Sequence, residues 1–173
     1  MVNRHSSRPA LPWKNGQGVC FDIYCPPTGE DWWELSTADL DRDCDFSHFP
    51  GVLRQFLVAQ GQVTLNIAGL EIVCSELSVT PFSGDSATTC NLSASAKALN
   101  LMQHTPRRRL VVIKAGDLFP EENVDAVVAV GGTASLVVGG ECLELELLDA
   151  VMWTKAEQPL FQLTSGSVAL VVR

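Results

Sequence analysis

Short apolar segments bounded by Gly, Pro, Asn, Asp or Ser follow one another along almost the whole chain. No ten-residue stretch carries the 3.6-residue period of an amphipathic helix, whereas residues 63–67 and 143–147 alternate apolar and polar side chains as strands do. Glycine pairs at 131–132 and 139–140 predict turns. The pattern predicts an all-β protein, a sandwich or barrel with little helix. The predicted strands are 19–25, 32–39, 53–59, 63–67, 70–74, 88–92, 98–102, 110–113, 124–130, 135–138, 142–147, 151–153, 161–163 and 168–172.

Two stretches of the chain repeat the same order of strands and turns. Residues 56–81 and residues 126–154 each contain three strand-like segments separated by glycine turns, followed by a segment that enters the next turn. A duplicated jelly roll would leave this pattern, with the break near 103–109. We therefore expect one domain over residues 1–105 and a smaller one over residues 106–173. Chance similarity between β-hairpins remains the alternative.

Charge and hydropathy exclude several partners. A formal net charge of −8 argues against nucleic acid, which requires clustered Lys and Arg. The one basic run, Arg107 to Arg109, precedes an apolar strand and is predicted to be a solvated start of that strand. No apolar run approaches the roughly 20 residues of a membrane span. The N-terminal segment lacks the apolar core of a signal peptide, so we expect a cytoplasmic protein that binds no membrane.

Six cysteines are spread along the chain without a C-x-x-C pair. A chain of 173 residues does not need disulfides to hold its core, and most of these cysteines lie in or beside apolar segments. We expect them to be reduced and structural. They are Cys20, Cys25, Cys44, Cys74, Cys90 and Cys142.

Several motifs occur in a fixed order over the first 103 residues. They are Pro12-Trp13-Lys14-Asn15-Gly16-x-Gly18, Trp33-x-Leu35-Ser36-x-Ala38, Phe46-Ser47-x-Phe49-Pro50-Gly51-x-x-Arg54, Gly61, Phe82-Ser83-Gly84-Asp85 and Asn100-Leu101-Met102. Together, in this order and spacing, they resemble the HutD/Ves family of proteins.

The resemblance implies a bicupin, that is, two fused jelly-roll β-barrels. It also implies a link to bacterial histidine utilisation or stress response, with binding of a breakdown intermediate such as formylglutamate as one proposal. The family has no obligatory metal. A cupin metal site resembles two histidines two residues apart, followed by a Glu and a later His. The three histidines of this chain, His5, His48 and His104, do not fit that pattern. We expect neither metal nor cofactor.

The chain departs from the family pattern at four places, one of which is Val19-Cys20, where a Thr is usual. Gln17 interrupts a run that is commonly three glycines, and Gln103-His104 replaces a usual Thr-Arg. Glu34 stands where the family usually has Arg, which reverses a charge. The ligand of this chain is therefore expected to differ from that of its relatives.

Lys14, Asn15 and Arg54 are candidate ligand-binding residues. The first two lie in a glycine turn, where an ammonium, an amide and free backbone N–H groups would form a carboxylate cradle. An inward-pointing Arg54 would have to be paired or ligand-bound. The alternatives are a solvated Lys14 beside a packed Trp13, and an Arg54 that is paired with Asp39, Asp45 or Asp85.

Ser36 and Asn100 lie in predicted strands and would orient a ligand if they are buried. Alternation would equally place them on the outer surface. Phe82-Ser83-Gly84-Asp85 is predicted to be a tight turn in which Asp85 accepts backbone N–H groups. His48 is predicted to be a surface loop residue.

These observations predict a protein that binds a small anionic metabolite without metal. One alternative is a metal-free enzyme, an isomerase or hydrolase, with Lys14 and one of Asp22, Glu34 or Asp39; no catalytic residue is assigned. Another is an interaction module, with the acidic strand 142–147 as its interface. A pocket filled completely by the aromatic side chains of Trp13, Trp32, Trp33 and Phe56 would favour this alternative. Association into a homodimer is left open.

Overall fold

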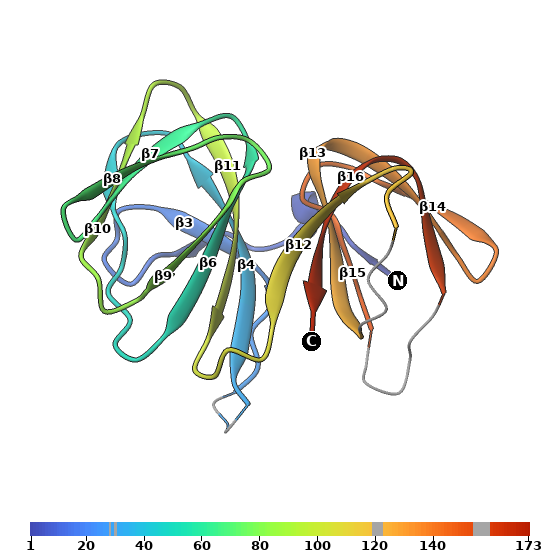
Figure 1. The fold of residues 1–173 in the computed structure, drawn as a ribbon, viewed down its shortest axis with the longest axis horizontal. Coiled ribbons are helices and arrows are strands. Elements are labelled where there is room, and N and C mark those ends of the chain that lie inside the picture. Colours follow the sequence, from blue (N-terminus) through green and yellow to red (C-terminus); the bar gives the residue numbers. More distant parts are fainter. Residues whose placement is uncertain (28, 30, 119–122, 154–159) are drawn as a thin grey trace. The chain divides into compact units, whose positions relative to one another are not determined.

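A computed structural model describes residues 1–27, 29, 31–118, 123–153 and 160–173. These residues form two units, one over Arg8–Arg107 (the N-terminal unit) and one over Met1–Ser7 with Arg108–Arg173 (the C-terminal unit). Strands dominate both, and the one helical element described is the short 3-10 turn η1 (His5–Ser7). The all-β prediction is confirmed (Figure 1). A helix long and apolar enough to cross a membrane does not occur in the described part of the chain.

The N-terminal unit consists of two antiparallel sheets. A six-stranded sheet runs in the order β2 (Leu11–Pro12), β3 (Val19–Tyr24), β4 (Trp33–Leu40), β11 (Ala96–Gln103), β6 (Leu53–Gln60) and β9 (Val79–Ser83). A four-stranded sheet runs β5 (Cys44–Asp45), β10 (Thr88–Leu92), β7 (Val63–Ile67) and β8 (Leu70–Cys74). Side chains from both sheets form one core, in which Phe56 and Val58 of β6 join Leu65 of β7 and Cys90 of β10. The sheets thus meet through buried side chains, as in a sandwich.

The C-terminal unit is built around one antiparallel sheet. Its order is β1 (Val2–Asn3), β15 (Ala150–Met152), β13 (Val124–Val138), β16 (Phe161–Val172) and β12 (Arg109–Lys114), with β14 (Glu141–Leu145) also paired to β13. Alternate residues of β13 and β16 point into a shared core that includes Val127, Leu136, Leu163 and Leu170. Among the described strands, no pairing joins the two edges of any sheet, so the expected closure into barrels is not seen and the sheets are open.

Two strands are longer than predicted, because the chain continues as strand through glycines where a turn or a break between strands was expected. β13 runs unbroken through Gly131 and Gly132, where the predicted turn is wrong; its ladder with β16 instead shifts register between Val130 and Ser135. β16 bends at Gly166, whose φ of +78° suits glycine and where a Cβ would overlap the carbonyl oxygen of Thr133. The predicted turn at Gly139–Gly140 is confirmed.

The first seven residues belong with the C-terminal unit, whereas the division drawn from the sequence placed residues 1–105 together. Val2 of β1 pairs with Val151 of β15. The Arg4 guanidinium lies 2.6 Å from the buried Asp149 carboxylate, which also accepts the backbone N–H of His5 at 2.8 Å. These contacts hold the N-terminal segment to a strand far away in the sequence.

Arg108 does not follow the prediction of a solvated basic run. Its side chain is buried and its Nε donates to Asp125 Oδ2 at 2.8 Å. Arg173 Nε lies 2.8 Å from the other oxygen of the same carboxylate. Asp125 is buried at a register shift of the β13–β16 ladder, so the C-terminal unit contains an internal ion pair that no local sequence pattern indicates.

Candidate functional site

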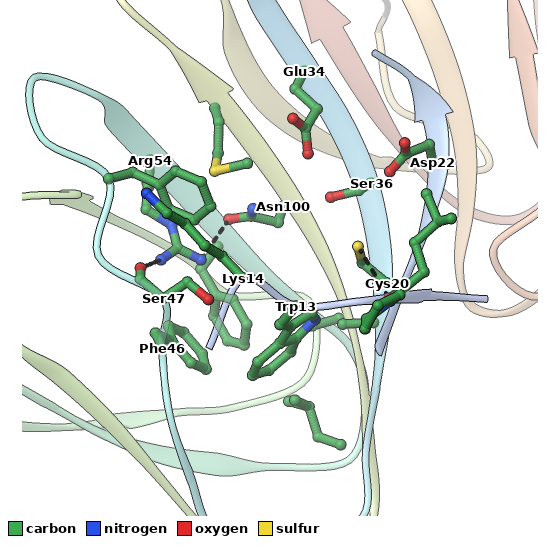
Figure 2. A pocket seen from close by; sticks show the side chains of 18 residues that line it. Trp13, Lys14, Cys20, Asp22, Glu34, Ser36, Phe46, Ser47, Arg54 and Asn100 are labelled. Atoms are coloured by element: carbon green, nitrogen blue, oxygen red, sulfur yellow. Dashed lines mark hydrogen bonds between the residues drawn. The ribbon is translucent and has the colours of Figure 1, made fainter. Parts of the chain in front are cut away.

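A cavity of about 230 Å³ lies within the N-terminal unit, on one face of its six-stranded sheet. It is lined from β3, β4, β11 and β6 by even-numbered residues, since alternate side chains of a strand point to the same face. The loops that contain Trp13-Lys14 and Phe46-Ser47 complete it. Figure 2 shows these side chains converging on one space.

Strand register places the polar side chains of the cavity in two rows across the sheet. In one row Asp22 of β3 pairs with Ser36 of β4, which pairs with Asn100 of β11. In the next row Glu34 of β4 and Arg54 of β6 both pair with Met102 of β11. The sheet thus presents an acidic side at β3 and β4 and a basic side at β6.

Arg54 is the most deeply buried charged group of this cavity, with 8% of the residue exposed. Its two terminal nitrogens donate long hydrogen bonds of 3.4 Å, Nη1 to the Ser47 carbonyl oxygen and Nη2 to Asn100 Oδ1. Its Nε has no hydrogen-bond partner among the described residues. A buried polar atom of this kind needs a partner, and a bound ligand would supply one.

Aromatic rings surround the Arg54 guanidinium. Its central carbon lies 4.9 Å from the ring centre of Phe82, 5.0 Å from that of Phe46 and 5.8 Å from that of Phe49. Such cation–π contacts partly replace the water that the cation loses on burial. The Arg54 guanidinium is therefore held among aromatic rings, with only two long hydrogen bonds to protein acceptors.

The carboxylates that could have neutralised Arg54 are engaged elsewhere. Asp39 pairs with Lys97, Asp45 bonds Gln17, and Asp85 accepts the Gly51 N–H. Across the described ranges no carboxylate comes within ion-pairing distance of Arg54. Burial lowers the pKa of the Arg54 guanidinium to about 10, and the charge of Glu34 opposes that fall. Arg54 therefore remains a cation at neutral pH.

Lys14 lies at the exposed margin of the cavity. Its Nζ is 5.8 Å from the ring centre of Phe49, the same ring that borders Arg54, so both cations serve one side of the cavity. No carboxylate or hydrogen-bond acceptor among the described residues is paired with it. Lys14 is thus solvated, as the alternative held, and also lines the cavity.

Asn15 does not line the cavity. Its Nδ2 donates to the Asp45 carbonyl oxygen at 2.8 Å, its Oδ1 accepts the Gln17 N–H, and its own N–H donates to Ser47 Oγ. Gln17, the residue that interrupts the expected glycine run, exchanges two hydrogen bonds with Asp45. Asn15 and Gln17 therefore fix the loop, and the structure gives the Asn15 amide a positioning role.

The acidic side of the cavity consists of Glu34 and Asp22. Burial raises the pKa of Glu34, and the charge of Asp22 raises it further, while hydrogen bonds from Cys25 and Ser36 and the charge of Arg54 oppose the rise. Burial also raises the pKa of Asp22. The sequence marked Glu34 as a departure from the family pattern and as one of three candidate acids of the enzyme alternative; its even-numbered position on the strand, shared with Ser36, was the signal that it lines the cavity.

The turn before Arg54 is fixed from a neighbouring loop. Both Asp85 carboxylate oxygens accept the Gly51 N–H, and Ser83 Oγ donates to Asp85 at 3.0 Å, which confirms the prediction for this motif. These bonds lower the pKa of Asp85, with that of Gly51 the largest contribution. Gly84 is needed because a Cβ there would overlap the Phe49 carbonyl oxygen. The motif thus orients the strand that begins before Arg54.

The histidines lie outside this cavity. His48 is exposed, with Nε2 at 3.2 Å from the Asp85 carbonyl oxygen, and the His104 ring lies tilted against Trp32, with 4.9 Å between ring centres. Within the described ranges, no three His, Cys, Asp or Glu side chains come together as metal ligands would. All six cysteines are free thiols.

Gly18→Ala is expected to weaken ligand binding severalfold while costing about 1 kcal/mol of stability. A Cβ at this position would lie 2.9 Å from the Trp13 indole, which lines the cavity and packs edge-on against Phe46 at 5.7 Å. The ring must shift to make room. Gly16→Ala is the control, because Gly16 has a φ of +70° but open space for a Cβ. Calorimetric titration and thermal unfolding of both variants measure this; equal loss of binding in the two would contradict the packing role.

The two-layer β fold of the N-terminal unit is similar to that of cupin-like proteins. A Cupin 2 conserved barrel domain protein from Leptotrichia buccalis has a similar fold, with a TM-score of 0.66 over 100% of this chain and 96% of that one, at 11% identity. The match shows the fold alone.

The chain belongs to the HutD family, whose model matches residues 5–171. HutD from Pseudomonas fluorescens SBW25, solved in a formate condition, superimposes with a TM-score of 0.80 at 26% identity, over 99% of this chain and 97% of that one. Protein Ves from Citrobacter koseri is 31% identical over 106 residues, 58% of this chain and 55% of Ves. The chain aligns with little more than half the length of its curated relatives.

Proposed function

We propose that this chain binds a small carboxylate metabolite in the cavity of its N-terminal unit, using Arg54 and Lys14 for charge recognition. The observation that carries the proposal is Arg54, a buried cation on the cavity wall with an unpaired Nε and no carboxylate partner among the described residues. Burying such a group is costly unless it is hydrogen-bonded and paired. A ligand carboxylate would supply both.

The geometry suits the planar carboxylate group. An arginine guanidinium is a planar fork of N–H donors that can bind two carboxylate oxygens at once. Asn100 already contacts Arg54 and lies one strand from the Ser36 hydroxyl, so both could orient the rest of the ligand. Lys14, at the margin, would add a longer-range attraction. Protein side chains supply all of this recognition, without a metal ion.

The biological setting of the proposal follows from the family. We place the chain among cytoplasmic bicupins that sense a metabolite and regulate histidine utilisation or a stress response. The fold of its HutD relative over nearly the whole chain supports this placement. The cavity is not filled by aromatic side chains: Trp32 packs against His104 and Trp33 stacks on Tyr24, which argues against a pure interaction module. A homodimer remains compatible with either role.

Lys14→Ala is expected to weaken carboxylate binding by about threefold to fivefold, because an exposed cation acts through a screened field. The probes are glutarate, formylglutamate, glutamate, urocanate and histidine, titrated calorimetrically and by thermal shift, with EDTA present. The effect of Lys14→Ala should shrink in high salt. Lys97→Ala, a lysine paired with Asp39 outside this cavity, is the control. If no probe binds, the proposed function is wrong. If Lys14→Ala binds the probes as tightly as the wild type, Lys14 does not take part in ligand binding.

A second candidate is an acid–base enzyme acting in the same cavity. Glu34 and Asp22 favour it, because neighbouring carboxyl groups with raised pKa values in a cleft are typical of general acids and bases. Asp39, the third candidate acid, pairs with Lys97 and does not line this cavity. Each probe that binds is incubated with the protein and followed by NMR. Conversion of the probe into a product by the wild type but not by Glu34→Gln would favour the enzyme over the binding protein.

A further inference from the structure

The cavity carries opposite charges on its two sides. Arg54 and Lys14 border the Phe49 ring on one side, while Glu34 and Asp22 project from β4 and β3 on the other (Figure 2). Glu34 and Arg54 flank Met102 in one row of the sheet. Two strand spacings separate them, or roughly 10 Å between backbones, and both side chains rise from the same face.

We infer that the ligand of this cavity is a zwitterion, a small carboxylate that also carries a protonated amine. The carboxylate binds Arg54, and the ammonium binds Glu34 with Asp22. This inference rests on the proposed function and adds the second half of the ligand. A short carbon chain between the two groups suffices to reach both sides.

The acidic side has no cation of its own within contact distance. Glu34 bonds only Cys25 and Ser36, and among the described residues no Lys or Arg forms an ion pair with Glu34 or Asp22. Two carboxylates on one apolar-walled cavity repel each other, which favours either a proton or a bound cation. A ligand ammonium would supply the missing positive charge and donate up to three hydrogen bonds.

The same arrangement disfavours a ligand with two carboxylates. If one carboxylate binds Arg54, a second at the far end of a short chain meets Glu34 and Asp22. Like charges at close range in a partly desolvated site cost affinity, and this repulsion selects against the wrong ligand. The Glu34 side chain thus sets ligand choice, whereas Arg54 sets affinity for any carboxylate.

The test compares three ligands that match in length and differ at one end: pentanoate, 4-aminobutanoate and glutarate. Isothermal titration at pH 7.5 is expected to show 4-aminobutanoate binding at least about tenfold more tightly than the other two. In Glu34→Gln this preference should fall, and in Asp22→Asn/Glu34→Gln it should vanish, with glutarate gaining affinity. Glu71→Gln makes the same charge change on exposed β8 and should retain the preference.

Each outcome separates this inference from the proposed function. Binding of all three ligands with equal affinity, or tightest binding of glutarate, overturns the zwitterion and leaves the carboxylate site standing. A preference that survives in the double variant also overturns it. Failure of all three to bind the wild type overturns the zwitterion, whereas the proposed function falls only if the wider panel of carboxylates also fails to bind. Thermal unfolding of each variant confirms that it is folded before its titration is interpreted.

Discussion

Arg54→Met is expected to weaken carboxylate binding by at least about a hundredfold while leaving the ligand-free protein as stable as the wild type or more so. A guanidinium that is 8% exposed, with one nitrogen unbonded and two bonds of 3.4 Å, recovers little of its lost hydration. Methionine has a similar length and packs well against the Phe46 and Phe82 rings. Removing the charge therefore relieves a cost in the empty protein and deletes the anchor for the ligand.

A ligand-binding role for Arg54 predicts that Arg54→Met loses affinity without losing stability, whereas a structural role predicts that it loses stability. Calorimetric titration and urea unfolding of Arg54→Met measure them, with Arg42→Met, an exposed arginine of the same unit, as the control. Arg54→Lys should recover part of the affinity, since an ammonium keeps the charge but loses the fork. A loss of several kcal/mol of stability in Arg54→Met would mean that the guanidinium holds the fold. If Arg54→Met still binds the ligand as the wild type does, the binding site does not include Arg54.

The strands that could be predicted at their observed bounds are those whose signals are local. β7 alternates apolar and polar residues, β8 and β10 are short segments bounded by turn residues, and each of the three matches the expected range. β13 and β16 could not be predicted as single strands because Gly131-Gly132 and Gly166 are locally indistinguishable from turn glycines. Their continuity depends on pairing between strands far apart in the chain.

The strand residues of the candidate site could be predicted, because alternate residues of a strand point to the same face. Ser36, Arg54 and Asn100 share one face of neighbouring strands, and the structure brings them to the cavity with Lys14. Asn15 could not be assigned correctly, because whether a loop amide points to a ligand depends on Asp45, thirty residues away. No sequence signal showed that Glu34 and Arg54 would face each other across Met102.

Arg108 illustrates the same limit for stability. A run of three arginines before a strand looks solvated, and only the fold shows that the middle one meets Asp125. Buried ion pairs add little net stability over apolar residues, but removing one partner leaves the other charge buried. This asymmetry makes the pair a strong probe of the C-terminal unit.

Asp125→Ala is expected to cost about 3–5 kcal/mol of unfolding free energy, the largest stability effect predicted for this protein. The carboxylate is buried and receives Arg108 at 2.8 Å on one oxygen and Arg173 at 2.8 Å on the other. Without it, the buried Arg108 guanidinium loses its counter-ion and two positive charges face each other. Urea unfolding followed by the fluorescence of Trp153, in the same unit, measures the change.

Asp39→Ala is the matched control, because it also deletes a strand aspartate from an ion pair. The Lys97 and Asp39 side chains are 33% and 30% exposed, so water screens the pair and its loss should cost no more than about 1 kcal/mol. In Arg108→Met/Asp125→Leu, apolar packing replaces most of the pair, and stability should return close to that of the wild type. Equal losses in Asp125→Ala and Asp39→Ala, or no recovery in the double variant, would show that the buried charges do not dominate the stability of this unit.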